Sequence, residues 1–448
     1  MQLANLTMIP KHKLIGLALL LIPALSFAQE NSPYSRYGIG NLSPQGNILT
    51  RGMGGISASF SDYSTVNFVN PASYGDIRRV TLDIALEIAS RTLLQQSPVS
   101  KFTSNYATVP YLSVGIPLFN PSSHPTNKYA KKGISWAAAF GLRPVSRINY
   151  KIENDGRLAG IDSLITTYEG NGGVNEAFIG TGVKIRKFSF GFNTGYLFGT
   201  KDYSTKIEFQ NDTANYIKSN SQTKTTFAGV FVNAGMQYTD TFSKGTILKI
   251  GAYGNLSQNY HASQDLTRET FYFTTTGSQT PLDSVYKLKG QTGKIKLPAS
   301  YGIGFSLEGT HILAGIDFES TTWTNYRFYD QADYLQNSWM LRGGFQFHPA
   351  GRTSKKYIDF VKYRAGVFYG QDYVSVDGKL PVYGVTAGLG LPLKLKRNFY
   401  ETQYSVLNIA LEYGSRGTKT SNNITENIFR LSFGFTFSDL WFRRYKYD

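Results

Sequence analysis

The sequence contains no cysteine, which excludes disulfide bonds, thiol chemistry and a lipoprotein attachment site. Its five histidines show none of the spacings of a metal site, and neither a G-x-S-x-G elbow nor a phosphate-binding loop is present. Beyond residue 28 no apolar run approaches the roughly 18 residues that a membrane-spanning helix needs. We therefore expect no catalytic residue, no metal and no cofactor, and the chain is predicted not to be an enzyme.

The first 28 residues have the pattern of a secretory signal peptide. Lys11 and Lys13 precede the apolar run 14–22, and Ser26 and Ala28 place small residues before the predicted cleavage site. A membrane anchor is the alternative, but the apolar run is shorter than the ~20 residues that cross a bilayer. The mature chain is thus expected to begin near Gln29, outside the cytoplasm.

The composition favours strands over helices. Of 448 residues, 45 are Gly, 31 Tyr and 30 Phe, and only 17% are charged. An exported chain of this kind without a spanning helix is either a secreted β protein or an outer-membrane barrel, because a closed barrel also satisfies every backbone group in lipid.

A period of two separates these possibilities. In "NIFRLSFGFTF", residues 427–437, large apolar residues occupy alternate positions from Phe429 to Phe437, whereas the positions between them are polar or small. The pattern recurs in "FSFGFNTGYLFG" from 188, "YGIGFSLEG" from 301 and "SVLNIALEYG" from 405. A soluble sandwich would also alternate, but its wet face would be rich in charges, whereas here that face carries mostly Gly, Ser and Asn.

We therefore predict an all-β fold, a transmembrane antiparallel β-barrel of about 14 strands. The expected strands are 79–93, 105–118, 133–152, 174–185, 187–208, 223–240, 245–275, 284–308, 311–329, 335–348, 357–371, 379–393, 404–416 and 427–438. The expected outer loops, including 120–132, 152–173, 208–224, 258–296, 325–336 and 414–427, are mostly polar. The predicted regions are a signal peptide (1–28), a plug (29–78), the barrel (79–438) and a basic tail (439–448).

The segment 29–78 is Gly-rich and aperiodic, which is typical of a compact plug inside a lumen. Gly52, Gly54 and Gly55 would permit positive φ angles, and Pro71 would hold Asn70 extended. A disordered tail is the alternative, but it would leave several large apolar residues in water.

At these residues the chain resembles the FadL/TodX family of outer-membrane transporters of long-chain fatty acids and other hydrophobic compounds. The resemblance rests on Arg51-Gly52-Met53-Gly54-Gly55, Asp62 and Asn70-Pro71-Ala72, and on strand-like segments at 169–185, 295–306 and 363–393. The ending "DLWFRRYKYD" is similar to barrels of the Bacteroidota, where related proteins also serve protein secretion.

The resemblance implies passive uptake through the lumen, with Arg51, Gly52, Gly54, Gly55, Asn70, Pro71 and Ala72 in a movable hatch. It also implies a lateral opening at a kink in the third strand. There the chain has Gly141 and Pro144, which weaken a strand or remove a ladder hydrogen bond. The alternative for Pro144 is an ordinary position at a turn or strand end.

Cargo recognition is less evident from the sequence. Arg342, Arg364 and Arg430 lie on the polar face of their strands and are candidates for binding a carboxylate. The favoured alternative is that they form structural ion pairs with inward Asp317, Glu308 and Glu412.

The expected location is the outer membrane, with membrane lipid and lipopolysaccharide as neighbours. The net charge of +16 suits an anionic lipid leaflet, and the dispersed Lys and Arg residues argue against nucleic acid as a partner. The predicted function is transport of hydrophobic compounds. The alternative is a structural barrel that acts as a partner in a protein secretion system, and the polar outer loops favour the transporter.

Overall fold

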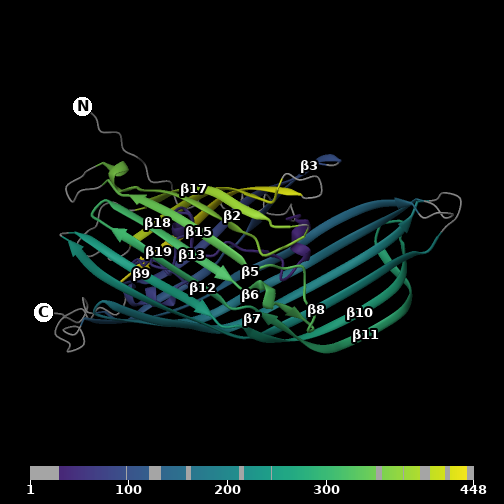
Figure 1. Ribbon diagram of the computed structural model, residues 1–448, viewed down its shortest axis with the longest axis horizontal. Helices are drawn as coiled ribbons and strands as arrows, with labels where there is room; N and C mark the ends of the chain where they lie inside the picture. The colour runs from purple at the N-terminus through teal and green to yellow at the C-terminus, as the bar shows by residue number, and fades with distance from the viewer. Residues whose placement is uncertain are drawn as a thin grey trace.

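The computed structural model describes residues 30–96, 98–120, 133–157, 163–210, 216–243, 245–349, 356–376, 378–393, 404–418 and 424–440. The expected signal peptide and almost all of the expected tail lie outside these residues, as does the expected loop 120–132 apart from Asn120. One antiparallel sheet contains every described strand (Figure 1).

The wall of the barrel consists of fourteen antiparallel strands, some of them built from two segments. Strand β2 (Val80–Gln96) pairs with both β3 (Val99–Thr108) and β4 (Leu112–Phe119), which together make the second wall strand. β9 (Thr246–Asn255) with β10 (Gln258–Phe273), and β11 (Gln279–Leu297) with β12 (Ser300–Glu308), are joined in the same way. The prediction of a fourteen-stranded antiparallel barrel is confirmed.

The other wall strands are β5 (Ile134–Arg157), β6 (Ser163–Ile185), β7 (Phe188–Phe209), β8 (Lys218–Ser243), β13 (Ile312–Thr321), β15 (Ser338–Phe347), β16 (Lys362–Gln371), β17 (Pro381–Pro392), β18 (Tyr404–Arg416) and β19 (Thr425–Asp439). Two-residue strands β1 (Asn41–Leu42) and β14 (Arg327–Phe328) are attached to β5 and β11. The barrel closes between its first and last strands, which pair from Thr425 with Leu94 to Asp439 with Val80.

The large apolar residues of the alternating strands face outward. On β19, Phe429 and Phe437 are 46% and 45% exposed, whereas the intervening Ser432 and Thr436 are 1% exposed. β12 shows the same contrast between outward Phe305 and buried Ser306. This arrangement is that of a membrane barrel and not that of two stacked sheets, whose apolar faces would be buried against each other.

Six wall strands continue past the rest of the barrel. β5, β6, β7, β8, β10 and β11 form a curved sheet at one end, which we call the wall extension (Figure 1). The expected outer loops 152–173, 208–224 and 258–296 were therefore largely wrong, because most of their residues lie in these strands. Both faces of this sheet are polar over much of its length, so the alternation that reveals a membrane strand is lost there.

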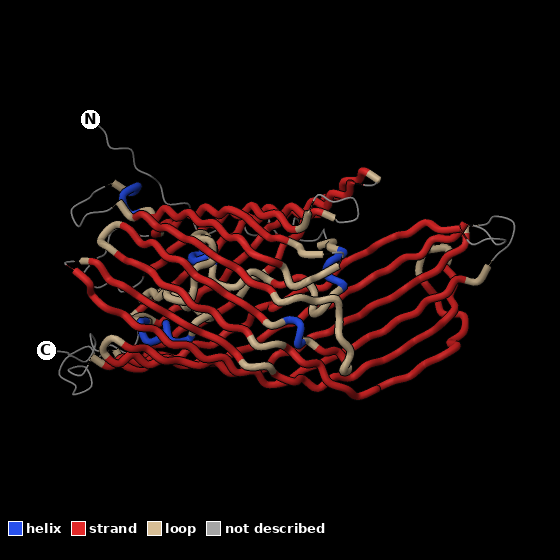
Figure 2. The backbone as a smooth tube through the Cα atoms, in the orientation of Figure 1, coloured by secondary structure: helices blue, strands red, loops and turns tan. Residues whose placement is uncertain are grey.

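The N-terminal segment Glu30–Arg79, which we call the plug, is threaded among the wall strands as loops and short helices (Figure 2). It contains the 3₁₀ helix η2 (Pro33–Arg36), the one-turn helix α2 (Ile48–Arg51) and the 3₁₀ helix η3 (Pro71–Asp76). Met53, Ile56, Ala58 and Val66 in this segment are all 0% exposed. Such burial is the opposite of a disordered tail.

Glycines on the inner face of the wall allow the plug to pack closely. A Cβ at Gly251 would lie 1.9 Å from the carbonyl oxygen of Ala58, and one at Gly366 would lie 2.1 Å from the nitrogen of Gly54. Further wall glycines at which a Cβ would come within 2.9 Å of a plug atom are Gly115, Gly182, Gly191, Gly235, Gly344, Gly388 and Gly434. These glycines come from nine different strands, so the plug contacts the wall on several sides.

Candidate functional site

The one-turn helix α2 of the plug places Arg51 against the wall. The side chain of Asn47 caps α2 by accepting a hydrogen bond from the backbone N–H of Thr50 at 3.0 Å. Arg51 is the last residue of α2, and its guanidinium pairs with the carboxylate of Glu87 on β2, with both side chains about 95% buried. This ion pair ties the plug to the barrel.

The three glycines that the sequence assigns to a hatch, Gly52, Gly54 and Gly55, serve two different purposes in the plug. Gly54 and Gly55 have φ angles of +69° and +87°, as expected, and Gly54 donates its N–H to Thr386 at 2.8 Å. Gly52 does not fit that expectation, because its φ is −62°. It is constrained by space instead, since a Cβ there would lie 3.1 Å from the Cα of Gly388.

The Asn70-Pro71-Ala72 motif forms the start of η3. Asn70 is extended, with φ −114° and ψ 101°, and its side chain accepts from the N–H of Ala72 at 3.1 Å. The same side chain donates to the carbonyl oxygen of Ala58 at 2.6 Å and so holds two parts of the plug together. The motif therefore shapes the plug. It does not lead directly into the first wall strand, because the rest of η3 lies between the motif and β2.

A carboxylate on the wall holds the middle of the plug. One oxygen of Asp317 on β13 accepts hydrogen bonds from the backbone N–H groups of Ser57 and Ala58, at 2.5 and 2.6 Å. From the sequence, Asp317 is expected only as a partner for an arginine. A short polar residue alternating with apolar neighbours does not reveal that it binds a backbone 260 residues away.

The third wall strand has a break on one side, after Leu142. Gly141 is paired with β4 and β6, so it does not lie in the break, but β4 pairing ends at Leu142. Pro144 lies just beyond, at a register shift against β6. From there on β3 is not paired with β5 within the described residues.

The plug occupies this break itself. Asn41 and Leu42 of β1 pair with Arg147 and Ser146 of β5, and the N–H of Ser32 donates to the carbonyl oxygen of Asn149 at 3.0 Å. The N-terminal segment thus replaces a wall strand over this part of β5. Sequence reasoning missed this pairing because β1 is only two residues long.

The three candidate arginines are all inside the barrel but do not converge on one site. Arg342 pairs with Glu319 at 2.6 Å, and Arg430 pairs with Glu412. Arg364 instead donates to the side chains of Gln346 and Asn408, at 2.8 and 2.9 Å. Of the expected carboxylate partners, Glu412 pairs with Arg430, whereas Glu308 pairs with Lys249.

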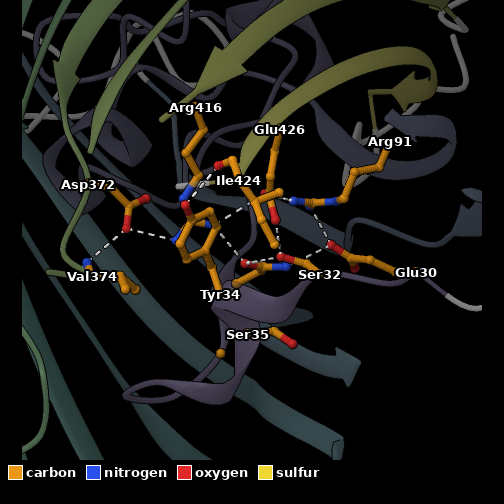
Figure 3. A network of polar contacts seen from close by, with 12 residues as sticks. Glu30, Ser32, Tyr34, Ser35, Arg91, Asp372, Val374, Arg416, Ile424 and Glu426 are labelled. Atoms are coloured by element: carbon orange, nitrogen blue, oxygen red, sulfur yellow. Dashed lines mark hydrogen bonds and ion pairs between the residues drawn. The ribbon is translucent and has the colours of Figure 1, made fainter. Parts of the chain in front are cut away.

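A buried polar network holds the first residues of the plug (Figure 3). Arg91 of β2 pairs with Glu30 at 2.5 Å and also with Glu426 of β19. Ser32 donates to Glu426 at 2.5 Å, and Arg416 pairs with Asp372 at 2.9 Å. Because most of these charges already have opposite partners, the network stabilises one plug position more than it offers a free charge to a ligand.

The loops that connect β13 with β15 and β16 with β17 cover the plug on the side of the wall extension. Trp323 in η4 (Trp323–Asn325) stacks on Tyr373 with ring centroids 4.4 Å apart, and the Tyr373 hydroxyl donates to the carbonyl oxygen of Gly40. Asp333 accepts from the N–H of Gly38 at 2.7 Å. We call this group of loops the cap.

A cavity of about 400 Å³ lies between the plug, the cap and the wall. Its lining includes the large apolar side chains of Leu197, Phe231, Tyr260 and Trp323. It also includes the charged Arg51, Arg342, Arg416 and Arg430, which have acidic partners. The cavity is thus amphipathic.

The pKa values of two plug residues, Asp76 and Tyr34, keep them at neutral pH in the protonation states that their contacts with the barrel require. Burial alone would raise the pKa of Asp76, but Lys184, whose amine lies 2.7 Å away, and Lys249 hold that pKa below its ordinary value. Burial raises the pKa of Tyr34 to about 12, so its hydroxyl stays protonated and donates to the carbonyl oxygen of Ile424 at 2.7 Å.

No helix among the described residues has the length and apolar character to cross a membrane. Within the same residues, no cluster of three or more His, Asp or Glu side chains is placed to bind a metal. His311 contacts the carbonyl oxygen of His348 through Nδ1 at 2.9 Å, a contact that positions the two chain segments.

Fourteen antiparallel wall strands, an outward apolar belt and the FadL/TodX type of barrel fold define the chain as a membrane β-barrel. The chain belongs to the BamG family, whose family model matches residues 8–448. A comparison with curated proteins found no significant match.

Solved structures support the fold. The toluene transporter TbuX of Ralstonia pickettii superposes with a TM-score of 0.54 at 12% identity, covering 89% of this chain and 99% of TbuX. The toluene transporter TodX of P. putida gives 0.52 at 14% identity, covering 90% and 100%. The monoaromatic hydrocarbon channel CymD gives 0.51 at 14% identity, covering 91% and 100%. At these identities the similarity concerns the fold alone.

Proposed function

We propose that this protein is an outer-membrane barrel that acts as a partner subunit of the barrel-assembly (BAM) machinery, with its lumen closed by a seated plug. The BamG family name points to that machinery. The wall extension is the observation that carries the proposal, because a channel needs no sheet of this kind beyond its wall.

The outward aromatic residues suggest where the membrane ends. Tyr301, Tyr369, Tyr383 and Tyr413 are each about half exposed and lie within three residues of an end of β12, β16, β17 and β18. Aromatic residues in such a belt favour the membrane–water interface. The wall extension would then project into the extracellular space, where it offers both faces of a sheet to a protein partner.

The contacts between the plug and the wall also favour a barrel whose lumen stays closed. The break beside β5 is occupied by the plug backbone, and Arg51, Asp317 and the network around Arg91 hold the plug at three separate places. Opening the lumen would expose or unpair several of these buried charges, which costs more than a ligand of modest affinity supplies.

Co-purification tests this proposal. The full-length protein carries an affinity tag and is extracted in mild detergent from its own outer membrane, with a tagged unrelated barrel as the control. We expect the central assembly barrel to copurify, and depletion of the protein to lower the amount of other folded barrels. A protein that purifies alone, with normal barrel assembly after depletion, would contradict the proposal.

The wall extension can be tested separately from the rest of the barrel. Leu266 pairs with Leu288, so residues 267–287 can be replaced by an Asn-Gly turn that removes the tip of β10 and β11. We expect loss of copurification with a barrel that remains folded, as judged by its heat-modifiable mobility in gels. Shortening the β2–β3 hairpin by its outermost pairs, Gln96 with Val99 and Gln95 with Ser100, is the matched control and should change nothing.

A second candidate function is passive passage of hydrophobic compounds, which the amphipathic cavity favours. In that reading Arg51, Gly52, Gly54, Gly55 and the Asn70-Pro71-Ala72 motif would form the movable hatch. The break after Leu142, beside Pro144 and close to Gly141, would be the lateral opening, and Arg342, Arg364 or Arg430 would bind a carboxylate. Mass spectrometry of lipids extracted from the purified protein tests it, and an empty barrel would contradict it.

A further inference from the structure

The wall has a second break, on β8, where no plug residue fills the ladder. β8 pairs with β10 as far as Ala228 and with β9 only from Ala234 onward. Residues 229–233 of β8 therefore have no ladder partner on β9 or β10. Opposite this part of β8, β9 ends at Asn255 and β10 begins at Gln258, with Leu256 and Ser257 between the two strands.

Side chains span this break in place of backbone pairing. The side-chain amide of Gln258 donates to the carbonyl oxygen of Val232 at 3.0 Å, and Gln258 is itself bonded by the hydroxyl of Tyr260 at 2.8 Å. One glutamine rotamer thus bridges the gap, and a rotamer change breaks fewer hydrogen bonds than the separation of two paired strands.

The break leads from an apolar outer face to apolar residues of the cavity lining. Outside, Val230, Val232 and Leu256 are 64%, 49% and 81% exposed. Inside, the cavity lining next to the break includes the apolar Phe231 and Leu297, beside the polar Asn233 and Gln258. An apolar surface on both sides of a gap suits an alkyl chain, because moving along it exposes no new apolar area to water.

The cavity also holds an unused hydrogen-bond donor. Trp323 is 5% exposed and lines the cavity, and its indole Nε1 has no partner among the described residues. A buried N–H of this kind is costly to leave unpaired. A ligand that combines an alkyl chain with an oxygen acceptor would satisfy both features.

We propose that the break between β8 and the β9–β10 junction is a lateral port, latched by Gln258, through which one acyl chain of a membrane lipid enters the cavity and contacts Trp323. This inference does not depend on the partner role proposed above. It also concerns a different face of the barrel from the break beside β5.

Fluorescence quenching tests the port. Trp136, Trp339 and Trp441 are replaced by Phe, which leaves Trp323 as the only tryptophan of the four in the chain. The full-length protein is reconstituted into phosphatidylcholine bilayers with or without brominated acyl chains, which quench tryptophan on contact. We expect the brominated lipid to lower the Trp323 emission by about half or more.

Two matched variants on β8 locate the route. Asn233→Phe narrows the cavity side of the break and is expected to remove most of the quenching, whereas Val230→Phe, on the lipid-facing side of the same strand, should leave it unchanged. Gln258→Gly removes the latch and is expected to increase quenching at equal lipid concentration. A protein that retains only Trp136, which is 45% exposed and does not line the cavity, serves as the positive control.

Emission of Trp323 that is equal in both lipids, while Trp136 is quenched, would overturn the proposal. Quenching that neither Asn233→Phe nor Gln258→Gly alters would overturn the route through β8. Folding of each variant is checked by heat-modifiable gel mobility, so that a misassembled barrel is recognised before its emission is compared.

Discussion

The ion pair between Arg51 and Glu87 allows a quantitative test of how firmly the plug is seated. Replacing Arg51 by Met leaves a carboxylate 95% buried against the wall. Removing one member of a buried pair costs about 3–5 kcal/mol. Glu87 still has Arg430 at 3.7 Å and the Ser432 hydroxyl at 3.3 Å, so we expect the lower end of this range.

A loss of about 3 kcal/mol corresponds to roughly a hundredfold increase in the population of unseated plug. The absence of native cysteine makes this measurable. Ser59 is 0% exposed, and its hydroxyl has no hydrogen-bond partner among the described residues, so Ser59→Cys introduces one thiol at little cost. A maleimide reagent should label that thiol only when the plug leaves its seat.

We expect Arg51→Met to raise the labelling rate about a hundredfold in the Ser59→Cys background. The double variant Arg51→Met with Glu87→Met removes both charges and should return the rate to within about tenfold of the parent, because apolar replacement of a whole buried pair is often nearly neutral. A labelling rate unchanged by Arg51→Met would refute the reasoning that this pair holds the plug.

Three further predictions concern a glycine of the plug, an ion pair of the plug and a lipid-facing side chain of the wall. In the Ser59→Cys background, Gly54→Ala should raise the labelling rate of the introduced thiol at least tenfold, because a Cβ there meets backbone oxygens at 2.6 and 2.8 Å; Gly55→Ala, which meets only the Arg342 side chain, should do less. Asp76→Asn should destabilise the plug at pH 7 in urea titrations, because the lowered pKa of Asp76 contributes stability above its ordinary value of 3.8; the difference from the parent should shrink as the pH falls below 3.8. Phe435→Lys, on the lipid-facing side, should lower barrel stability by about 2–4 kcal/mol in refolding titrations if it lies at mid-membrane.

The strands of the membrane belt were predictable because lipid on one side and a plug on the other impose a strict alternation. Phe429 to Phe437 on β19 show this, and each of the fourteen expected strands overlaps an observed wall strand. The close approach of the plug to wall glycines such as Gly251 and Gly366 accounts for the small residues on the inner face.

The wall extension and the plug anchors could not be predicted in the same way. Strands such as the outer part of β11, where residues 281–292 are all exposed, contact polar surroundings on both faces and therefore show no hydrophobic period. Contacts such as Ser57 with Asp317 join residues 260 positions apart, and no local pattern marks them. Gly52 illustrates a subtler failure, since its need for space and not for a positive φ becomes visible only with Gly388 beside it.

The seating of residues 30–43 has a consequence for the order of biogenesis. Ser32 and Tyr34 are bonded to Glu426 and Ile424, residues that leave the ribosome nearly four hundred positions later. The earliest part of the mature chain to be synthesised therefore reaches its final neighbours only after the last hairpin exists. Complete seating of residues 30–43 is therefore expected to be a late step in barrel formation, because β19 must first be in place.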